Sequence, residues 1–480
     1  MPGAAGSTPV ADVDTGSALP RRIVRDLPDP PRQLWRLVGP GIVGAGVALS
    51  SGEFILWPYI ASQVGLVFLW GAAIGAITQF FLNMEIERYT LATGEAVLTG
   101  FNRIWRHWGL ILAIMVYFAN LWPGWALSSA TLLSYLVGGE PRSLGVGLLL
   151  IAGAGLTLAP IVYVALERLL IAKVIAVGVL AVLATIFAID AESWRALPAG
   201  LSGVQGFPRE LGFALLFGAM VFAGGGGGQN LCQSNWIRDK GFGMGHYLPR
   251  LVSPITGVEE AVPTRVSYIF EPTLANMTRW RRWWRFANVE QALTFALMTI
   301  VTICLTSMLA HSLVYGQPGL QNSVVFLKAE ADQLAATVGA WFGGFFLAVG
   351  AFSLFGAAMG IIDYTSRLAA DVLKSTYLAS SGTTESRIYF WLVWGLVAVG
   401  CVILIAGAAQ PLPLLIISAT VGGGMMFIYS ILLIVINKTL LPVPIRVRGF
   451  RTATLVWATA LFGTLATLTA WQQIGNLFRS

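Results

Sequence analysis

Long apolar stretches alternate with short polar connections along most of this 480-residue chain. The hydrocarbon core of a bilayer is about 30 Å thick and needs about 20 apolar residues per crossing helix. Stretches of this kind have predicted bounds 39–62, 66–89, 108–138, 143–163, 165–190, 211–237, 286–313, 338–366, 388–408, 411–437 and 452–474. They are continuously apolar rather than alternating, which favours helices over a β-barrel. The pattern therefore predicts an all-α integral membrane protein with eleven spans.

Composition supports this prediction and excludes a soluble globular chain. Hydrophobic residues make up 56% of the sequence and charged residues only 11%, far from the averages of soluble domains. The first 33 residues are the exception, since they are rich in Gly, Ala, Pro and Asp. We expect residues 1–33 to form a disordered cytoplasmic tail and residues 34–480 to form the membrane domain. The tail has no apolar core before Leu34, so it is not a cleavable signal peptide.

Lysine and arginine residues concentrate on one side of the predicted spans. If the amino terminus is cytoplasmic, about 25 of the 30 basic residues fall on the cytoplasmic side, Arg168 and Lys173 among them. Cytoplasmic loops of membrane proteins carry such an excess. We therefore expect a multi-pass protein of the cell membrane with its amino terminus inside and its carboxyl terminus outside. The net charge of +7 follows from this topology and gives no reason to expect a nucleic-acid partner.

Two segments interrupt the apolar pattern inside predicted spans. Span one contains an acid beside two hydroxyls, and span six contains five consecutive glycines followed by two amides. The residues concerned are Ser50, Ser51, Gly52 and Glu53 in span one, and Phe222, Ala223, Gly224, Gly225, Gly226, Gly227, Gly228, Gln229 and Asn230 in span six. Each glycine gives up about 1 kcal/mol of helix propensity relative to alanine, so the run predicts a broken helix. Freed backbone groups at membrane depth must line a cavity or be covered by protein.

Paired interruptions in spans one and six are typical of transporters built from inverted repeats. The repeats would comprise about residues 39–190 and 211–437, with an extra helix at about 452–474. Other interpretations remain open for single features. The glycines could serve close helix packing, Glu53 could be a structural carboxylate, and Asp363 could simply pair with Arg367. No catalytic or ATP-binding motif is present, so we expect neither an enzyme nor a cofactor.

Several short motifs occur in an order that resembles the Nramp family of divalent-metal transporters. They are Gly39-Pro40, Gly65-Leu66, Leu69-Trp70, Thr93-Gly94-Glu95, Leu166-Glu167-Arg168-Leu169, Gly218-Ala219 and Leu414-Leu415-Ile416-Ile417-Ser418. The resemblance covers most of the chain. It implies a LeuT-type fold of two inverted five-helix repeats plus an eleventh helix, with alternating access to a site at the bilayer midplane.

The functional positions of that family are occupied by other residues here. Where Nramp proteins have Asp-Pro-Gly-Asn, this chain has Ser50-Ser51-Gly52-Glu53, and Met-Pro-His corresponds to Phe222-Ala223-Gly224. The second histidine of the family corresponds to Gln229, and its acidic pair in span three to Trp122 and Trp125. Glu53, with Ser50, is the remaining candidate metal ligand. The methionine of the Nramp motif, whose thioether is a soft metal ligand, is missing here, which argues against transport of a bare transition metal. The acidic pair of span three is also missing, which argues against the family's route for protons.

Small and aromatic residues replace these groups and predict a widened site. We expect Trp57, Trp122, Trp125 and Gly423 to line it, together with the two interrupted segments. Such a site would fit a hydrated divalent cation, because magnesium dehydrates reluctantly. It would equally fit a small amine or amino acid, through Glu53, aromatic rings and open amides. The sequence therefore predicts a secondary transporter of a divalent cation, possibly hydrated, which the family resemblance and Glu53 favour. The alternatives are a carrier of a small organic solute, such as an amine or amino acid, or a transporter-like sensor.

Overall fold

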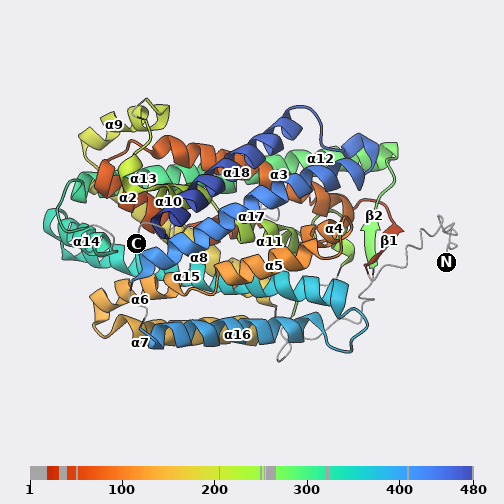
Figure 1. Cartoon of the computed structure of the whole chain (residues 1–480), viewed down its shortest axis with the longest axis horizontal. Coiled ribbons are helices and arrows are strands. Elements are labelled where there is room, and N and C mark those ends of the chain that lie inside the picture. The colour runs from red at the N-terminus through yellow and green to blue at the C-terminus, as the bar shows by residue number, and fades with distance from the viewer. Residues whose placement is uncertain are drawn as a thin grey trace.

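A computed structural model of the chain describes residues 19–31, 40–49, 52–159, 161–204, 206–248, 251–252, 255, 266–320, 324–407 and 410–477. Within these residues, eight helical segments are long and apolar enough to cross a membrane. They are Trp108–Val137, Pro141–Leu158, Val162–Phe187, Leu274–Val314, Ala340–Tyr377, Glu385–Ile405, Pro411–Thr439 and Phe450–Gln472. Most run along the long axis of the molecule (Figure 1). The chain is therefore a multi-pass membrane protein.

The other three predicted spans also coincide with helices. Span one consists of α1 (Pro40–Ala48), the π-helical turn η2 (Gly52–Leu56) and α2 (Trp57–Val64). Span two is α3 (Leu69–Thr93), whose second half carries several charged residues. Span six consists of α10 (Phe213–Val221) and α11 (Gly226–Lys240). Spans one and six are thus interrupted where the sequence predicts.

The remaining spans follow the predicted order. They are α5 (Trp108–Ala119) with α6 (Gly124–Val137), α7 (Pro141–Leu158), α8 (Val162–Phe187), α12 (Leu274–Gln291) with η5 (Ala292–Leu297) and α13 (Met298–Val314), α15 (Ala340–Val372) with η6 (Leu373–Tyr377), α16 (Glu385–Ile405), α17 (Pro411–Thr439) and α18 (Phe450–Leu477). Shorter elements connect them: α4 (Val97–Asn102), α9 (Ala191–Ser202), η3 (Arg209–Leu211), η4 (Gly243–Tyr247), α14 (Val325–Thr337) and η7 (Val443–Ile445). In Figure 1, α9 and α14 lie at one end of the molecule and α4 at the other.

Contacts between helices come in matched sets. Helix α2 of span one packs on α13 of span seven, as α10 and α11 of span six pack on α3 of span two. Span five packs on span eight (α8 on α15), as span ten packs on span three (α17 on α5 and α6). Spans four and nine contact each other. If each of spans one to five is replaced by the span five places later, and the reverse, the same set of contacts is obtained. Two structural repeats have this property.

Part of the predicted amino-terminal tail is folded. Strand β1 (Arg21–Val24) pairs in parallel with β2 (Val266–Ile269), in the register Arg21 with Val266. The guanidinium of Arg25 lies over the rings of Tyr247 and Tyr268, 4.9 and 5.1 Å from their centroids. Within the predicted tail, Arg21–Val24 thus form a strand, because they hydrogen-bond to a partner strand far along the chain that the local sequence does not reveal. Residues 1–18, 32 and 33 lie outside the described residues.

Apolar side chains cover the outside of the helical bundle. Trp391 of α16 is 72% exposed and Ile186 of α8 is 64% exposed, and similar residues follow the outer faces of α7 and α18. In water such a surface would be unfavourable, whereas lipid chains are as apolar as the side chains themselves. The buried polar and charged residues include Gln79, Lys173 and Gln229, which lie inside the bundle.

Candidate functional site

The break in span one exposes backbone carbonyls that other spans cover. Ser353 of α15 donates a hydrogen bond to the carbonyl of Leu49 at 2.6 Å. Thr306 of α13 donates to the carbonyl of Glu53, also at 2.6 Å. The side chain of Glu53 is 1% exposed. Ser50 and Ser51, which are predicted to bind substrate, lie outside the described residues.

The break in span six is held by one side chain from span two. The amide nitrogen of Gln79 donates to the carbonyls of Val221 and Ala223 at 3.0 and 2.8 Å. Its oxygen accepts from the backbone N–H groups of Gly225 and Gly226 at 3.1 and 3.2 Å. Gln79 is fully buried. Gln79 thereby hydrogen-bonds backbone N–H and C=O groups that have no partner within the irregular segment. Such groups need a partner because the bilayer core contains no water.

Sequence reasoning missed Gln79, although a glutamine inside an apolar span is a detectable signal. The same oxygen of Gln79 accepts from the side chain of Asn230 at 3.2 Å, and Asn230 also donates to the hydroxyl of Tyr429 at 3.3 Å. The predicted site residues Ala223, Gly225, Gly226 and Asn230 are thus gathered around Gln79.

The two breaks contact each other. A β-carbon on Gly52 would lie 1.9 Å from the carbonyl oxygen of Phe222, so only glycine permits this approach. Close by, the side chain of Gln229 donates to the carbonyl of Gly44 in α1 at 2.5 Å. The structure therefore brings the predicted residues of spans one and six together at the interface of the two repeats.

Among the described residues, several glycines that were expected to widen the site have close neighbours. A β-carbon on Gly227 would meet the carbonyl oxygen of Gly422 at 2.4 Å, and one on Gly228 would meet the side chain of Val116 at 2.9 Å. Gly225 lies against the side chain of Gln229. Neighbouring helices occupy the space that side chains would take at these glycines, because small residues let helices approach closely. In this structure Gly227 and Gly228 thus make close helix contacts, and their part in substrate binding stays a prediction.

Lys173 lies beside the break in span one. It was assigned to the cytoplasmic side by the count of basic residues, but it is fully buried in α8. Its side chain packs on Gly356 of α15, where a β-carbon would lie 3.1 Å from Cδ. Among the described residues, Nζ has no hydrogen-bond partner, and Glu53 is the charged group that interacts with it electrostatically. The candidate site thus contains a base as well as the predicted acid.

Span three has an interruption that the sequence analysis missed. Helix α5 ends at Ala119 and α6 begins at Gly124, with Pro123 between them. Asn120 donates to the hydroxyl of Thr365 at 2.9 Å and accepts from the hydroxyl of Tyr364 at 3.3 Å. Asn-Leu-Trp-Pro-Gly is a readable break signal, because proline cannot continue a hydrogen-bonded helix.

The predicted lining residues lie in different surroundings. Trp57 stacks on Phe68, with ring centroids 5.4 Å apart. Trp122 packs edge-on against Phe118 at 6.1 Å, whereas Trp125 lies in a separate pocket between α6, α7, α15 and α16. A β-carbon on Gly423 would meet the ring of Phe217 at 2.0 Å. Trp57 and Gly423 thus have close apolar neighbours, Trp125 borders a hollow, and their lining of a substrate site stays a prediction.

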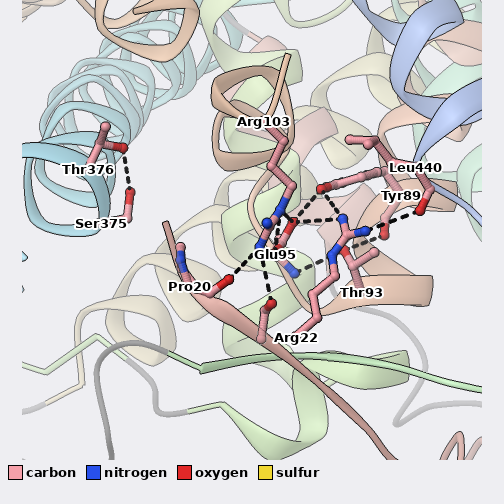
Figure 2. A network of polar contacts seen from close by, with 10 residues as sticks. Pro20, Arg22, Tyr89, Thr93, Glu95, Arg103, Ser375, Thr376 and Leu440 are labelled. Carbon is pink, nitrogen blue, oxygen red and sulfur yellow. Dashed lines mark hydrogen bonds and ion pairs between the residues drawn. The ribbon is translucent and has the colours of Figure 1, made fainter. Parts of the chain in front are cut away.

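A second polar cluster closes the end of the bundle that carries β1. Glu95 lies at its centre, between Arg22 of β1 and Arg103, which follows α4 (Figure 2). Arg22 also donates to the hydroxyl of Tyr89 at 3.0 Å, and Arg103 donates to the carbonyl of Pro20 at 2.6 Å. The cluster borders a hollow of about 670 Å³ that is partly open to solvent. It ties the amino-terminal segment across this end of the protein.

The pKa of the Glu95 carboxyl reflects this environment. Burial alone raises it, but the positive charges of Arg22 and Arg103 and their hydrogen bonds lower it to about 2, from 4.5. Glu95 is therefore ionised at every physiological pH. In the sequence Glu95 is part of the motif Thr93-Gly94-Glu95, which by itself indicates no role for the carboxylate.

Further charged side chains are buried between α11, α15 and α16. Arg367 donates two hydrogen bonds to Asp363, at 2.8 and 3.1 Å, and pairs with Asp239. Arg238 pairs with Asp371 at 2.5 Å. The interpretation of Asp363 as a structural partner of Arg367 is thus confirmed. Among the described residues, no group of three His, Cys, Asp or Glu side chains is placed to hold a metal ion.

The chain is similar in fold to solved structures of a manganese transporter from Eremococcus coleocola. One of them, in complex with an aromatic bis-isothiourea substituted compound, has a TM-score of 0.67 and 12% identity. A mutant of the same transporter has a TM-score of 0.68 and the same identity. Both comparisons cover 97% of this chain and 92% of the other.

Sequence comparisons add nothing to this likeness. No protein-family model matches the chain, and no curated protein matches its sequence. At 12% identity the similarity shows the fold alone. Together with the broken spans and the matched helix contacts, it confirms the predicted LeuT-type fold of two inverted repeats plus an eleventh helix.

Proposed function

We propose that this protein is a secondary transporter that works by alternating access, with its substrate site between the breaks of spans one and six. The observation that carries the proposal is the contact of Gly52 with the carbonyl of Phe222. Each break belongs to a different repeat, so rocking of one repeat against the other opens or closes this contact. The similarity of fold to manganese transporter structures supports the same conclusion.

The end of the bundle that carries β1 is, in this proposal, the closed cytoplasmic end. Arg22, Glu95 and Arg103 hold the amino-terminal segment across it. The amino terminus is then cytoplasmic, as the distribution of basic residues indicates. In Figure 1, β1 and the marked carboxyl terminus lie toward opposite ends of the long axis, which suits a carboxyl terminus outside.

The substrate that these residues suit best is a small organic solute with an amine or a carboxylate, such as an amino acid. Lys173 interacts electrostatically with Glu53, and a positive charge there offsets that of the carboxylate, so the pair suits a bare cation less well than a lone carboxylate would. Among the described residues, the side-chain oxygen of Asn230 and Nζ of Lys173 are buried without hydrogen-bond partners, so one can accept and the other can donate a hydrogen bond. Such groups match an organic molecule that both donates and accepts hydrogen bonds.

A divalent cation, possibly hydrated, is the second candidate, and it would make the protein a divergent relative of the Nramp family. The likeness to manganese transporter structures favours it, as does the buried carboxylate of Glu53. Glu53 and Ser50 would then be metal ligands, which stays a prediction. The aspartate and thioether of the Nramp motif are absent from the sequence.

Reconstitution into liposomes tests the proposal. Counterflow of radiolabelled alanine, leucine, glutamate and lysine is measured beside Mn²⁺ and Mg²⁺ influx with metal-sensitive dyes. We expect saturable counterflow of an amino acid and no metal influx. Metal influx without counterflow would favour the second candidate. Stabilisation of the purified protein by a solute that never crosses the membrane would instead identify a sensor and overturn the transport proposal.

A further inference from the structure

Helix α12, the turn η5 and helix α13 expose one continuous stripe of side chains. Every fourth residue along the stripe is exposed, and residues four apart lie on the same face of a helix. The first two are arginines and the next four are apolar: Arg281, Arg285, Val289, Leu293, Leu297 and Val301. The exposed face thus changes from charged to apolar within one turn of α12. Such a change is expected where the headgroup layer of a bilayer meets its hydrocarbon core.

Both arginines of the stripe lack an acidic partner. Their neighbours Arg279 and Arg282 pair with Asp29, at 3.6 and 3.7 Å. Within the part of the chain that the structure describes, neither Arg281 nor Arg285 forms an ion pair with a carboxylate. Both are exposed, and they lie one helical turn apart. Their charges are therefore available to a partner from outside the chain.

A third arginine reaches the same part of α12 from α18. Arg451 donates a hydrogen bond to the side chain of Asn288, and its guanidinium lies 4.7 Å from the ring centroid of Trp284. Trp284 and Asn288 each lie three residues after one of the two exposed arginines. Residues three apart are neighbours on the surface of a helix. Three guanidinium groups are therefore gathered around one turn of α12.

The charge of Arg451 is balanced only in part. Its carboxylate partner Glu85, at 3.2 Å, also pairs with Arg88 at 2.6 Å. The guanidinium of Arg88 lies 4.1 Å from the ring centroid of Trp284, so both arginines contact the same ring. One carboxylate cannot balance two guanidinium groups. This pair thus adds positive charge to that of the two exposed arginines.

The apolar part of the surface continues onto α3 and α18. Both α12 and α18 pack on α3. The exposed ring of Phe450, at the start of α18, contacts the ring of Phe81 of α3, with centroids 5.5 Å apart. Ile77, one turn before Phe81, is also exposed, as is Trp457 of α18, which donates to the hydroxyl of Thr78 at 3.2 Å. An apolar surface therefore lies next to the arginines.

The two halves of this surface call for different chemistry in one ligand. Guanidinium groups bind phosphate oxygens through paired N–H donors, whereas the apolar half suits hydrocarbon. A soluble anion would leave the apolar half uncovered. A zwitterionic lipid brings a positive group that offsets the attraction of its phosphate to the arginines. An anionic phospholipid meets both requirements.

We propose that this surface is a binding site for an anionic phospholipid in the leaflet at the end of the bundle that carries β1. The phosphate lies between Arg281 and Arg285, and an acyl chain follows Val289 and Leu293 along the stripe. The headgroup also lies beside Arg451, so the lipid joins α12 to the start of α18. The site lies outside the two helix breaks, and its occupation does not depend on the proposed transport.

Native mass spectrometry of the protein in uncharged detergent tests the site. Phosphatidylglycerol and phosphatidylcholine with the same acyl chains are titrated separately, and phosphatidylglycerol should bind more tightly. An arginine near an anionic headgroup changes affinity about fivefold. The double variant Arg281→Gln with Arg285→Gln should therefore weaken binding of phosphatidylglycerol about tenfold or more.

The matched control removes the same charge from two other exposed arginines at the same end of the bundle. Arg106→Gln with Arg387→Gln serves this purpose, because Arg106 follows α4 and Arg387 lies at the start of α16. It should bind phosphatidylglycerol within about twofold of the wild type. Equal losses in both double variants would overturn the site, because net charge alone would then explain the attraction. Phosphatidylcholine binding as tight as that of phosphatidylglycerol would also overturn it.

Two further measurements separate the lipid from other occupants. Glycerol 3-phosphate carries the anion without acyl chains and should not displace the lipid at millimolar concentration, and displacement would assign the arginines to a soluble anion instead. Light scattering should show no dimer that depends on this surface. A dimer that the Arg281→Gln, Arg285→Gln variant dissolves, without any lipid preference, would assign the surface to a second copy of the chain and overturn the proposal.

Photocrosslinking locates the lipid on the wild-type protein, even if the double variant proves hard to purify. Phosphatidylglycerol with a diazirine in one acyl chain should label peptides that contain Val289 to Val301 or the start of α18. Labelling confined to other helices would contradict the location. An excess of unlabelled phosphatidylglycerol should remove the label, and an equal excess of phosphatidylcholine should not.

Discussion

The α-carbon of Gly52 faces the carbonyl of Phe222 so closely that a β-carbon there would lie 1.9 Å from the oxygen. Gly52→Ala must therefore push the two breaks apart. We expect it to destabilise the protein by roughly 1–3 kcal/mol and to abolish counterflow, because overpacking forces backbone shifts. Thermal melting and liposome counterflow measure the two effects. Gly178→Ala is the matched control, since Gly178 faces open space on α8. Wild-type transport by Gly52→Ala would contradict the proposed site.

Gln79 should be indispensable for the break in span six. Gln79→Leu keeps the size of the side chain but leaves the carbonyls of Val221 and Ala223 and two backbone N–H groups without partners. We expect a loss of roughly 2–4 kcal/mol in unfolding free energy. Gln63→Leu is the control, because Gln63 bonds to the neighbouring Ser62 and is half-buried. Equal melting temperatures of both variants would show that the break does not depend on Gln79.

Glu95 should hold the amino-terminal segment in place above a defined pH. Its pKa is about 2 in the folded protein against 4.5 otherwise, so its stabilising effect is complete above about pH 4.5 and is lost as the pH falls through about 2. Glu95→Gln should speed amide hydrogen exchange in β1 about tenfold at neutral pH. The difference from the wild type should shrink below pH 4.5. Asp29→Asn, an exposed carboxylate of the same segment, should leave exchange unchanged.

Lys173 should control the charge preference of the candidate site. Lys173→Met removes the ammonium that counteracts Glu53, so the remaining carboxylate attracts cations more strongly. We expect Mn²⁺ to bind this variant at least about tenfold more tightly than the wild type, as measured by titration calorimetry. Lys328→Met, which changes an exposed lysine, should bind Mn²⁺ like the wild type. No gain in Mn²⁺ affinity would argue against a pairing of Lys173 with Glu53.

Every predicted span coincides with a helix, because long apolar runs have few alternatives, but two helical segments extend further, to Leu274 at the start of span seven and to Tyr377 at the end of span eight. Spans one and six were recognised as broken from Ser50–Glu53 and the glycine run, since both violate the rule for membrane helices. The Asn120–Pro123 interruption carries a similar local signal and was overlooked. The fold was therefore largely predictable from local pattern.

The candidate site was predictable only in part, because its contacts depend on neighbours that pattern does not reveal. Glycine in a span permits either an open cavity or close packing, and only the positions of Gly422 and Val116 decide between them. Lys173 was counted on the cytoplasmic side although it lies inside the predicted span 165–190, because the rule about topology counts every lysine alike. Gln79 acts on a segment about 140 residues further along the chain. No local pattern connects the two.

The pairing of β1 with β2 has a consequence for the order of assembly. Residues 21–24 leave the ribosome first, but their partner strand comes only at residues 266–269, after six spans have been made. The amino-terminal segment must wait undocked while those spans enter the membrane, because chains are synthesised at about 5–20 residues per second. Closure of this end by Arg22 and Glu95 is therefore a late step in the maturation of the protein.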